Sequence, residues 1–316
     1  MIAIDKLCRN FGKTIAVDNV SFKVELREIV GLLGHNGAGK STLMKMLTAS
    51  LEPSDGSISI NGIDLRQDRQ RAQSQIGYLP ENSPLYPEMT VLAYLEYAAA
   101  LKAIPESKRR ERIAYALYKT RIIDVAEKKI ATLSRGYKQR LGVAQAILNS
   151  PSILILDEPT NGLDPSQISE MRSLVTELAE HAMVIISTHI LQEVEAICQR
   201  VLIINKGKLA LDSKLDKLRS SPGISITIGR DGEAKSFPEL FAAARFKVLE
   251  CTQMGERFNY SLEAESEDEH LVPALVEKLV QEHCKIYAVH PLSKDLEAVF
   301  REISHGKSIP VEALSN

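Results

Sequence analysis

The residues best suited to chemistry lie in one glycine-rich stretch. It matches the phosphate-loop pattern G-x-x-x-x-G-K-[ST] at every fixed position, and it consists of Gly34, His35, Asn36, Gly37, Ala38, Gly39, Lys40, Ser41 and Thr42. Glycines let successive backbone N–H groups surround a polyphosphate. The lysine ammonium reaches the β- and γ-phosphates, and the serine hydroxyl offers an oxygen to Mg²⁺. We therefore predict that this loop binds a nucleoside triphosphate.

A pair of acids, Asp157 and Glu158, offers the second half of such a site, directly after the apolar residues 153–156. An aspartate at the C-terminal end of a strand beside the phosphate loop is suited to hold Mg²⁺. The neighbouring Glu158, pointing the other way, is suited to polarise an attacking water. Taken alone, an apolar strand that ends in two acids is more often just a strand followed by a polar turn. When it follows a phosphate loop in the sequence at this distance, it indicates an ATPase.

The stretch Leu133-Ser134-Arg135-Gly136 is the most discriminating feature. Ser134 is suited to cap the helix that follows, and Gly136 permits close approach of the backbone. Because a capped helix N-terminus attracts anions, the stretch is suited to contact a phosphate. Taken alone, an ordinary helix cap explains it equally well.

Apolar runs predict the elements that must position these residues. Residues 29–33, 153–156 and 183–187 are mainly apolar runs that favour buried parallel strands. The first of them leads into the phosphate loop, and a helix begins behind it. Alternation at residues 2–4 and 22–26 predicts strands of an antiparallel sheet. Strand, glycine loop and helix form the arrangement that phosphate binding requires.

The remaining segments predict three further regions. Thr90 is suited to cap a helix that Pro105 ends, and a helical subdomain is expected at about residues 85–140. Ser220-Ser221-Pro222-Gly223 predicts a domain boundary. We thus expect an α/β protein: a P-loop NTPase core with an antiparallel β subdomain and the helical subdomain in residues 1–219. A small C-terminal α+β domain with a ferredoxin-like fold is expected at 223–304, followed by a tail at 305–316.

Composition excludes some functions. The 316 residues are 44% hydrophobic and 25% charged, as in ordinary globular proteins. Residues 231–316 hold 9 Lys and Arg against 16 Asp and Glu, which argues against nucleic-acid binding there. The four cysteines are scattered, as expected of free thiols in a reducing cytosol. No signal peptide is recognisable, and no apolar run approaches the roughly 20 residues that span a bilayer. A role at a membrane would therefore require another chain.

The order of these motifs resembles the nucleotide-binding subunit of ATP-binding-cassette (ABC) transporters over residues 1 to about 218. The phosphate loop is followed by a loop with Glu81, by Leu133-Ser134-x-Gly136, by Asp157-Glu158, by Gly162-Leu163-Asp164 and by His189. The combination is highly specific, although its single members are not.

This resemblance implies roles around the nucleotide. Phe11 stacks on adenine, and residues 34–42 cradle the phosphates of ATP. Ser41 and Asp157 hold Mg²⁺. Glu158 is the general base, while His189 contacts the γ-phosphate and orients the water. Without the resemblance, a histidine at a strand end is more often structural, and Phe11 is simply an aromatic residue.

The resemblance also implies a head-to-tail homodimer with two sites at its interface. Ser134 and Gly136 act in trans, closing over ATP bound to the phosphate loop of a second subunit. Asp164 lies at the dimer seam. Glu81 occupies the position that usually holds glutamine, near Mg²⁺ and the attacking water.

Three departures from the general ABC pattern are informative. The usual Leu-Ser-Gly-Gly-Gln is Leu133-Ser134-Arg135-Gly136-Tyr137, the usual glutamine is Glu81, and Arg27-Glu28 replaces Gly-Glu. The first two resemble the bacterial ABC-2 branch of drug-resistance and gliding-motility ATPases, many of which serve export. The sequence Asp295-Leu296-Glu297-Ala298-Val299-Phe300 resembles the C-terminal extension of those subunits, with lower specificity.

We therefore interpret the chain as an ATP-hydrolysing motor of a bacterial ABC exporter, with ATP and Mg²⁺ as cofactors. The expected partners are ABC-2-type permease subunits, through which it would be peripheral on the inner, cytoplasmic face of the cell membrane. The alternative is a soluble ABC ATPase without a permease, acting in translation or DNA repair. Such proteins usually carry a second cassette or coiled-coil insertions, which this sequence lacks. A nucleotide kinase would need neither Ser134 and Gly136 nor His189.

Overall fold

The computed structural model describes residues 1–219, 223–230, 237–255, 257–264, 266, 268, 270–291 and 296–304. They form two compact units, one comprising Met1–Leu215 with the described residues 302–304, and the other lying within Asp216–Arg301. The expected break at residues 220–222, Asp295 and the expected tail at 305–316 lie outside the described residues. The domain limits expected from the sequence therefore stay predictions.

A six-stranded, mainly parallel sheet forms the centre of the larger unit. Its order is β10-β9-β3-β8-β7-β6, and its strands are β3 (Ile29–Leu33), β6 (Ile76–Leu79), β7 (Ile153–Asp157), β8 (Met183–Ser187), β9 (Arg200–Asn205) and β10 (Lys208–Lys214). All neighbours run parallel except β9 and β10, which form an antiparallel hairpin. Every residue of β3, β7 and β8 is buried, because alternate side chains enter two apolar cores, one on each face. The predicted buried parallel strands are confirmed.

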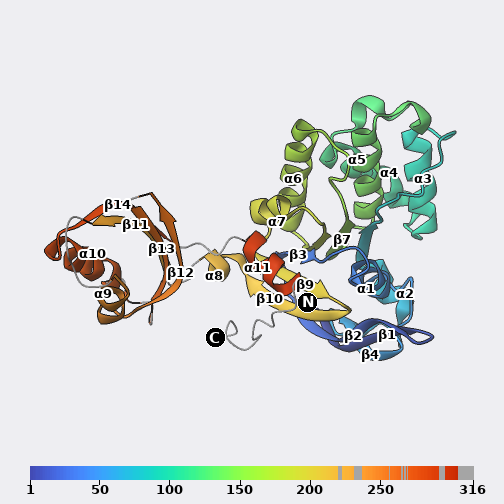
Figure 1. Cartoon of the computed structure of the whole chain (residues 1–316). Coiled ribbons are helices and arrows are strands. Elements are labelled where there is room, and N and C mark those ends of the chain that lie inside the picture. Colours follow the sequence, from blue (N-terminus) through green and yellow to red (C-terminus); the bar gives the residue numbers. More distant parts are fainter. Residues whose placement is uncertain are drawn as a thin grey trace. The chain divides into compact units, whose positions relative to one another are not determined.

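An antiparallel sheet covers one side of this centre. Its order is β2-β1-β4-β5, with β1 (Ile2–Phe11), β2 (Thr14–Val24), β4 (Asp55–Ile60) and β5 (Ile63–Asp64). Figure 1 shows β1, β2 and β4 together at the lower edge of the unit, below α1 (Lys40–Leu47) and α2 (Arg69–Ser74). Leu7, Leu43 and Val30 belong to one apolar core, so this sheet, α1 and the central sheet are packed together. The predicted antiparallel sheet is confirmed.

A helical part lies at the opposite end of the unit in Figure 1 and contains α3 (Val91–Leu101), α4 (Glu106–Lys119) and α5 (Arg135–Ile147). Thr90 caps α3 as predicted, its hydroxyl oxygen accepting a hydrogen bond from the Ala93 amide at 3.2 Å. Pro105 separates α3 from α4, consistent with the poor fit of proline inside a helix. The other helices are α6 (Pro165–Ala179), α7 (Leu191–Ile197) and α8 (Leu215–Arg219), with short 3₁₀ turns at Ile123–Val125 and Ile130–Thr132.

The smaller unit has the β-α-β-β-α-β order of a ferredoxin-like fold. Its elements are β11 (Gly223–Arg230), α9 (Phe237–Ala243), β12 (Phe246–Met254), β13 (Arg257–Ala264), α10 (Leu271–Gln281) and β14 (Cys284–Pro291). The strand order is β12-β13-β11-β14, and all neighbours are antiparallel. Phe237, Phe241 and Tyr260 join α9 to the sheet in an aromatic core. The sequence-based expectation of a two-layer α+β fold is confirmed.

Helix α11 (Leu296–Ser304) is the last described element, and its final residues belong to the larger unit. The Asn205 side-chain amide donates a hydrogen bond of 2.9 Å to the carbonyl of Ile303. The Ser304 hydroxyl lies 2.6 Å from Nε2 of His35. The end of α11 therefore contacts the phosphate loop.

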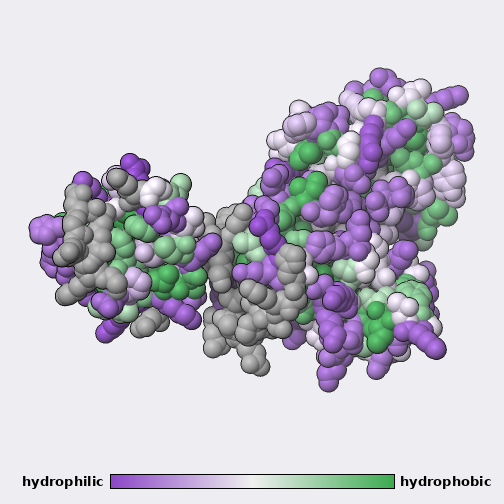
Figure 2. Space-filling view, viewed as in Figure 1, coloured by the Kyte–Doolittle hydropathy of each residue, from purple (hydrophilic) through white to green (hydrophobic). Residues whose placement is uncertain are grey.

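The surface is of mixed polarity. In the view of Figure 2, hydrophilic side chains interrupt the apolar ones over the coloured part of the molecule. Among the described residues, no helix combines the length and apolar character needed to cross a membrane. All four cysteines are free, as predicted.

Candidate nucleotide-binding and hydrolysis site

The phosphate loop joins β3 to α1, as its sequence predicts. Gly39 directly precedes α1 with φ of 111°, and a Cβ built there would lie 2.5 Å from the Ala16 carbonyl oxygen. Both the torsion angle and the contact require glycine at this position. The first N–H groups of α1 have no partners within the helix and are oriented toward the loop, where they can bind an anion.

Lys40 is held across this loop. Its side chain is buried, and its ammonium donates hydrogen bonds to the carbonyls of Gly34 and His35, the latter at 3.2 Å. Burial lowers the pKa of Lys40 below its usual value, and the carboxylates of Glu158, Asp157 and Glu81 oppose this shift. The lysine is therefore positioned beside a loop that a polyphosphate would fill, with acidic groups gathered around it.

Asp157 is the last residue of β7. In the sheet order β3-β8-β7, β8 lies between β7 and β3, the strand that leads into the phosphate loop. Both strands are fully buried apolar runs, and such a sequence does not encode which strand lies next to which. The C-terminal ends of parallel strands still meet at one edge of the sheet. Burial raises the pKa of Asp157, and the Glu81 carboxylate acts in the same direction.

Glu158 has a strained backbone and a confined side chain. Its φ of 49° lies in the left-handed region that is uncommon for glutamate. The side chain is 11% exposed, and its two carboxylate oxygens lie 2.9 and 3.0 Å from Nδ1 of His189. Burial raises the pKa of Glu158 above its usual value, while the bond to His189 acts in the opposite direction. A carboxylate with a raised pKa is a better proton acceptor than an ordinary one.

His189 follows the end of β8, so two parallel strands bring Glu158 and His189 together at the same edge of the sheet. Its side chain is 57% exposed, in contrast to that of Glu158. One ring nitrogen is held by the carboxylate, which leaves the other available to a ligand. The pair is therefore arranged to hold a water or a phosphate oxygen at its exposed side.

Ser134 and Asp164 each cap a helix. The Ser134 hydroxyl accepts a hydrogen bond of 3.4 Å from the Tyr137 amide at the start of α5, and the Asp164 carboxylate accepts one of 2.9 Å from the Gln167 amide in α6. Gly136 is buried, and a Cβ there would lie 2.8 Å from the Gln167 side chain. The starts of α5 and α6 are thus packed against each other. Ser134, Gly136 and Asp164 therefore form a cluster of their own, in addition to the cluster at the phosphate loop and the strand ends.

Phe11 ends β1 and is 48% exposed. The Arg9 guanidinium lies 4.7 Å from the centroid of its ring. An exposed aromatic ring held in this way offers a surface on which a planar base can stack.

Glu81 follows β6 and is exposed. Its carboxylate nevertheless acts on the buried groups of the site. Burial raises the pKa of Tyr78 to about 12, and the charges of Asp157 and Glu81 contribute to this shift. Glu81 therefore lies within electrostatic reach of both Asp157 and Lys40.

The available oxygen donors fit a nucleotide-bound Mg²⁺. Within the described part of the chain, no cluster of three or more His, Cys, Asp or Glu residues could hold a metal by itself. Ser41, exposed in the first turn of α1, and Asp157 are two hard oxygen donors of the kind Mg²⁺ prefers. In such sites the remaining positions belong to phosphates and water.

Two further groups at the site were not predicted from the sequence. The Gln139 side-chain amide in α5 donates a hydrogen bond of 3.5 Å to the Glu158 carbonyl, and the buried Glu193 in α7 contacts the loops after β7 and β8. A buried glutamate on a short helix has no local sequence signal, because its partners come from distant strands.

The parallel sheet, the phosphate loop, the carboxylates at the strand ends and the capped α5 together define a P-loop nucleotide-binding ATPase. Residues 17–161 match the family described as ABC transporter. The chain belongs to the ATP-binding proteins of ABC transporters. It is accordingly an ATPase that binds ATP.

Relatives and solved structures support this assignment over most of their length. YxlF of Bacillus subtilis, an uncharacterized ABC transporter ATP-binding protein, is 39% identical over 219 residues, covering 69% of this chain and 72% of YxlF. SrtF of Streptococcus pyogenes, a lantibiotic transport ATP-binding protein, is 36% identical, covering 68% of this chain and 92% of SrtF. The dimeric structure of the bacterial ABC transporter cassette MJ0796 is 25% identical, with a TM-score of 0.61, covering 68% of this chain and 98% of that one.

Proposed function

We propose that this chain is the ATP-hydrolysing motor of an ABC-2-type exporter, acting as a homodimer on a separate membrane permease. The observation that carries the proposal is a groove between β6 and α3, beside the candidate site. The wall of the groove formed by β6 continues along the chain to Glu81. A partner seated in the groove would be linked to the candidate site through Glu81. By this proposal the protein is cytoplasmic and is held at the inner face of the cell membrane by the permease.

The candidate site supports direct hydrolysis of ATP. The phosphate loop binds the triphosphate, and Lys40 neutralises its charge. Mg²⁺, held by Ser41 and Asp157 when bound, would stabilise charge on the phosphates. Glu158 accepts a proton from the attacking water, and His189 orients that water against the γ-phosphate. Phe11 stacks on the adenine.

Two copies complete each site. Ser134 is exposed at the start of α5, where Gly136 is buried beneath it, and this helix N-terminus, with Asp164 nearby, is suited to contact the phosphates bound by a second copy. The dimeric MJ0796 cassette supports this arrangement. ATP closes the dimer, and hydrolysis reopens it.

Replacing Ser134 by arginine is expected to prevent ATP-dependent dimer formation, because bulk and positive charge would stand at the contact between the copies. The side chain is exposed, so folding should be preserved. Gel filtration with ATP and Mg²⁺, carried out in a hydrolysis-deficient Glu158→Gln background, measures the effect. Ser107→Arg, at an exposed position in α4, is the matched control. A stable dimer of the Ser134→Arg protein would contradict the contact.

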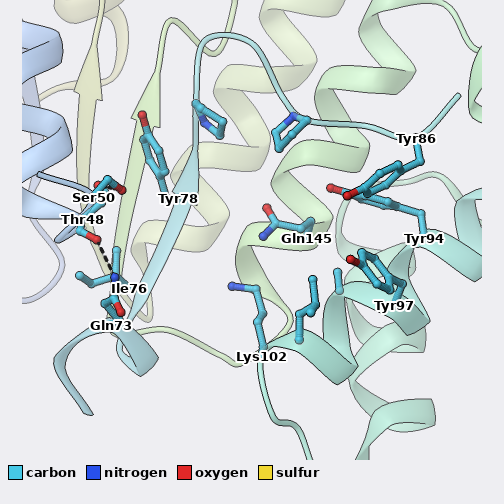
Figure 3. Close-up of a pocket in the computed structure, with 14 residues that line it drawn as sticks. Thr48, Ser50, Gln73, Ile76, Tyr78, Tyr86, Tyr94, Tyr97, Lys102 and Gln145 are labelled. Carbon is cyan, nitrogen blue, oxygen red and sulfur yellow. Dashed lines mark hydrogen bonds between the residues drawn. The ribbon is translucent and has the colours of Figure 1, made fainter. Parts of the chain in front are cut away.

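The groove has a volume of about 480 Å³ and is rich in tyrosine. In Figure 3, Tyr86, Tyr94 and Tyr97 gather on one side, and Thr48, Gln73 and Tyr78 lie on the other. The ring centroid of Tyr86 lies 6.3 Å from the ring centroid of Tyr94 and 5.6 Å from that of Tyr97. Tyrosines provide apolar area together with hydroxyl groups, which suits the binding of a short amphipathic segment.

We assign this groove to a cytoplasmic segment of the permease. Its wall at Tyr78 leads through Pro80 to Glu81, so movement of the docked segment would shift Glu81 relative to Asp157. The sequences at residues 78–82 and 136–140 resemble the ABC-2 branch, which favours export. The similarity to SrtF, a lantibiotic transport ATP-binding protein, supports a transport role.

Glu81→Ala is expected to retain ATP binding but to lose much of the permease-stimulated ATPase rate. Glu81→Gln should keep near-normal basal hydrolysis, because the amide retains an oxygen and removes a repulsive charge beside the phosphates. ATPase assays with and without the reconstituted permease, across a Mg²⁺ titration, compare the variants with the control Glu180→Gln, at an exposed glutamate after α6. If both Glu81 variants match the wild type in stimulated rate and Mg²⁺ dependence, Glu81 is only an exposed loop acid.

Co-purification from membranes tests the function itself. A tagged copy of this chain should capture an integral membrane protein, and Tyr97→Arg in the groove should abolish the capture while leaving ATP binding intact. Recovery of the protein only in the soluble fraction, without a membrane partner, would favour the alternative of an ABC ATPase that works without a permease.

A further inference from the structure

Glu193 is a buried carboxylate close to the candidate site but outside the motifs. It lies in α7 and is 4% exposed. The hydroxyl of Thr160 donates a hydrogen bond to its Oε1, and the hydroxyl of Thr188 donates one of 3.0 Å to its Oε2. Both threonines are buried as well, at 5% and 0% exposure. Each carboxylate oxygen thus accepts a hydrogen bond from a different loop.

The two threonines stand next to the residues proposed for hydrolysis. Thr160 follows Glu158 by two positions in the loop after β7, and Thr188 directly precedes His189 after β8. The Thr188 hydroxyl oxygen also accepts a hydrogen bond of 3.1 Å from the Ile190 amide, which fixes the turn that carries His189. Glu193 is therefore bonded to both loops whose side chains meet in the Glu158–His189 pair.

Packing alone does not explain an ionisable group in this place. A small cavity beside Glu193 is lined mainly by apolar side chains, including those of Val175, Ile186 and Val194, and the side chain of Arg172 also lines it. Removing a carboxylate from water costs free energy unless hydrogen bonds compensate it, and an apolar residue would fill the same space without that cost. The two hydroxyl bonds both compensate the burial and fix the distance between the loops.

The backbone of Glu158 also needs external support. Its left-handed φ of 49° persists only where the surrounding structure holds it. The Glu158 amide donates a hydrogen bond of 2.9 Å to the Ser187 carbonyl, which fixes one side of the residue. The bond from Thr160 to Glu193 holds the chain two residues further on.

We propose that Glu193 is a positioning residue, which braces the loops of Thr160 and Thr188 so that Glu158 and His189 keep the geometry required for hydrolysis. This inference rests on the proposed function, in which Glu158 and His189 act on the attacking water. Neither Glu193 nor its two threonine partners belong to the phosphate loop, which joins β3 to α1. Loss of the brace should therefore slow hydrolysis and leave ATP binding nearly unchanged.

The sharpest test compares Thr160→Val with Thr160→Ser. Valine has nearly the shape of threonine but cannot donate to Glu193, whereas serine keeps the hydroxyl. Since small misplacements of catalytic groups are costly, Thr160→Val should lower kcat on the order of tenfold while KM for ATP changes less than about twofold. Thr160→Ser should recover most of the rate. Glu180→Gln, at an exposed glutamate after α6, is the control for charge loss.

A double-mutant cycle separates a brace from general loss of stability. Glu193→Ala and Thr160→Val remove the same bond, so their combined effect on kcat should be smaller than the product of the separate effects. Thermal unfolding of each variant identifies any that is misfolded. If Glu193→Ala does not fold, the Thr160 pair and Thr188→Val against Thr188→Ser still decide the question.

The outcomes also separate this inference from the function on which it rests. A wild-type kcat for Thr160→Val in folded protein, with Glu158→Gln inactive, would overturn the brace alone. An equal loss for Thr160→Ser and Thr160→Val would also overturn it, because the hydroxyl would then be irrelevant. Wild-type hydrolysis by Glu158→Gln would instead overturn the proposed function.

Discussion

Lys40→Ala is expected to reduce ATP hydrolysis by at least about a hundredfold, since removing one preorganised charge from a transition-state site has effects of this order. The Lys40 side chain is buried, and its ammonium is held by the carbonyls of Gly34 and His35. No other cation is held in the loop in this way among the described residues. Phosphate release measures hydrolysis, and isothermal titration with ATP measures binding.

The Lys40 prediction needs a control for loss of a lysine as such. Lys108→Ala, at an exposed position in α4, removes the same charge away from the loop and should retain the wild-type rate. Normal turnover by folded Lys40→Ala would show that the phosphate loop is not the hydrolytic site.

Glu158→Gln is expected to bind ATP but to hydrolyse it about two to three orders of magnitude more slowly, because the amide cannot accept a proton from water. The nearly isosteric amide should still accept a hydrogen bond from His189, so the loops after β7 and β8 should stay in place. The protein should accumulate as an ATP-bound dimer, detected by gel filtration with ATP and Mg²⁺. A variant found only as a monomer would argue against closure of a dimer by ATP.

The pH dependence of the wild type gives a second test of Glu158. Burial raises the pKa of this carboxylate, and only its deprotonated form acts as a base. The wild-type kcat/KM, which reports the free enzyme, should therefore fall as pH decreases through a value above the usual range for glutamate. The residual kcat/KM of Glu158→Gln should lack this limb. Measurement at ATP concentrations well below KM over the acidic range distinguishes the two profiles.

Much of the fold was predictable from local sequence patterns. Residues 29–33 and 183–187 are apolar enough to predict buried strands, and both became strands with these bounds. The expectation of a small, ferredoxin-like α+β fold beyond residue 223 agrees with the element order and sheet order of the smaller unit. These predictions worked because hydrophobic periodicity reports directly on which side chains are buried.

Relations between distant segments were not predictable from such patterns. The insertion of β8 between β3 and β7 depends on packing of apolar strands that are interchangeable in character. The bonds of Glu193 join loops that only the folded sheet brings together. The contact of Ser304 with His35 likewise links residues 269 positions apart, without a local signal in either segment.

For the candidate site, the sequence identified the chemical groups but not their surroundings. The phosphate loop and Asp157-Glu158 were recognisable because phosphate and metal chemistry restrict residue type and spacing. The positive φ of Glu158 and the burial that raises its pKa depend on neighbours, so they became visible only in the structure. The roles of the site residues stay predictions.

The central claim is that each hydrolytic site is shared by two copies, and mixing two inactive variants tests it most directly. A Lys40→Ala copy keeps an intact Ser134, and a Ser134→Arg copy keeps an intact phosphate loop. A mixed head-to-tail dimer would therefore contain one complete site with an unsubstituted contact, and the bulk and charge of Ser134→Arg would affect only its other contact. Neither variant can form a complete site alone. ATPase activity should be low for each variant and should reappear on mixing, rising with protein concentration. Activity of the mixture no greater than the sum of the two separate proteins would contradict a shared site.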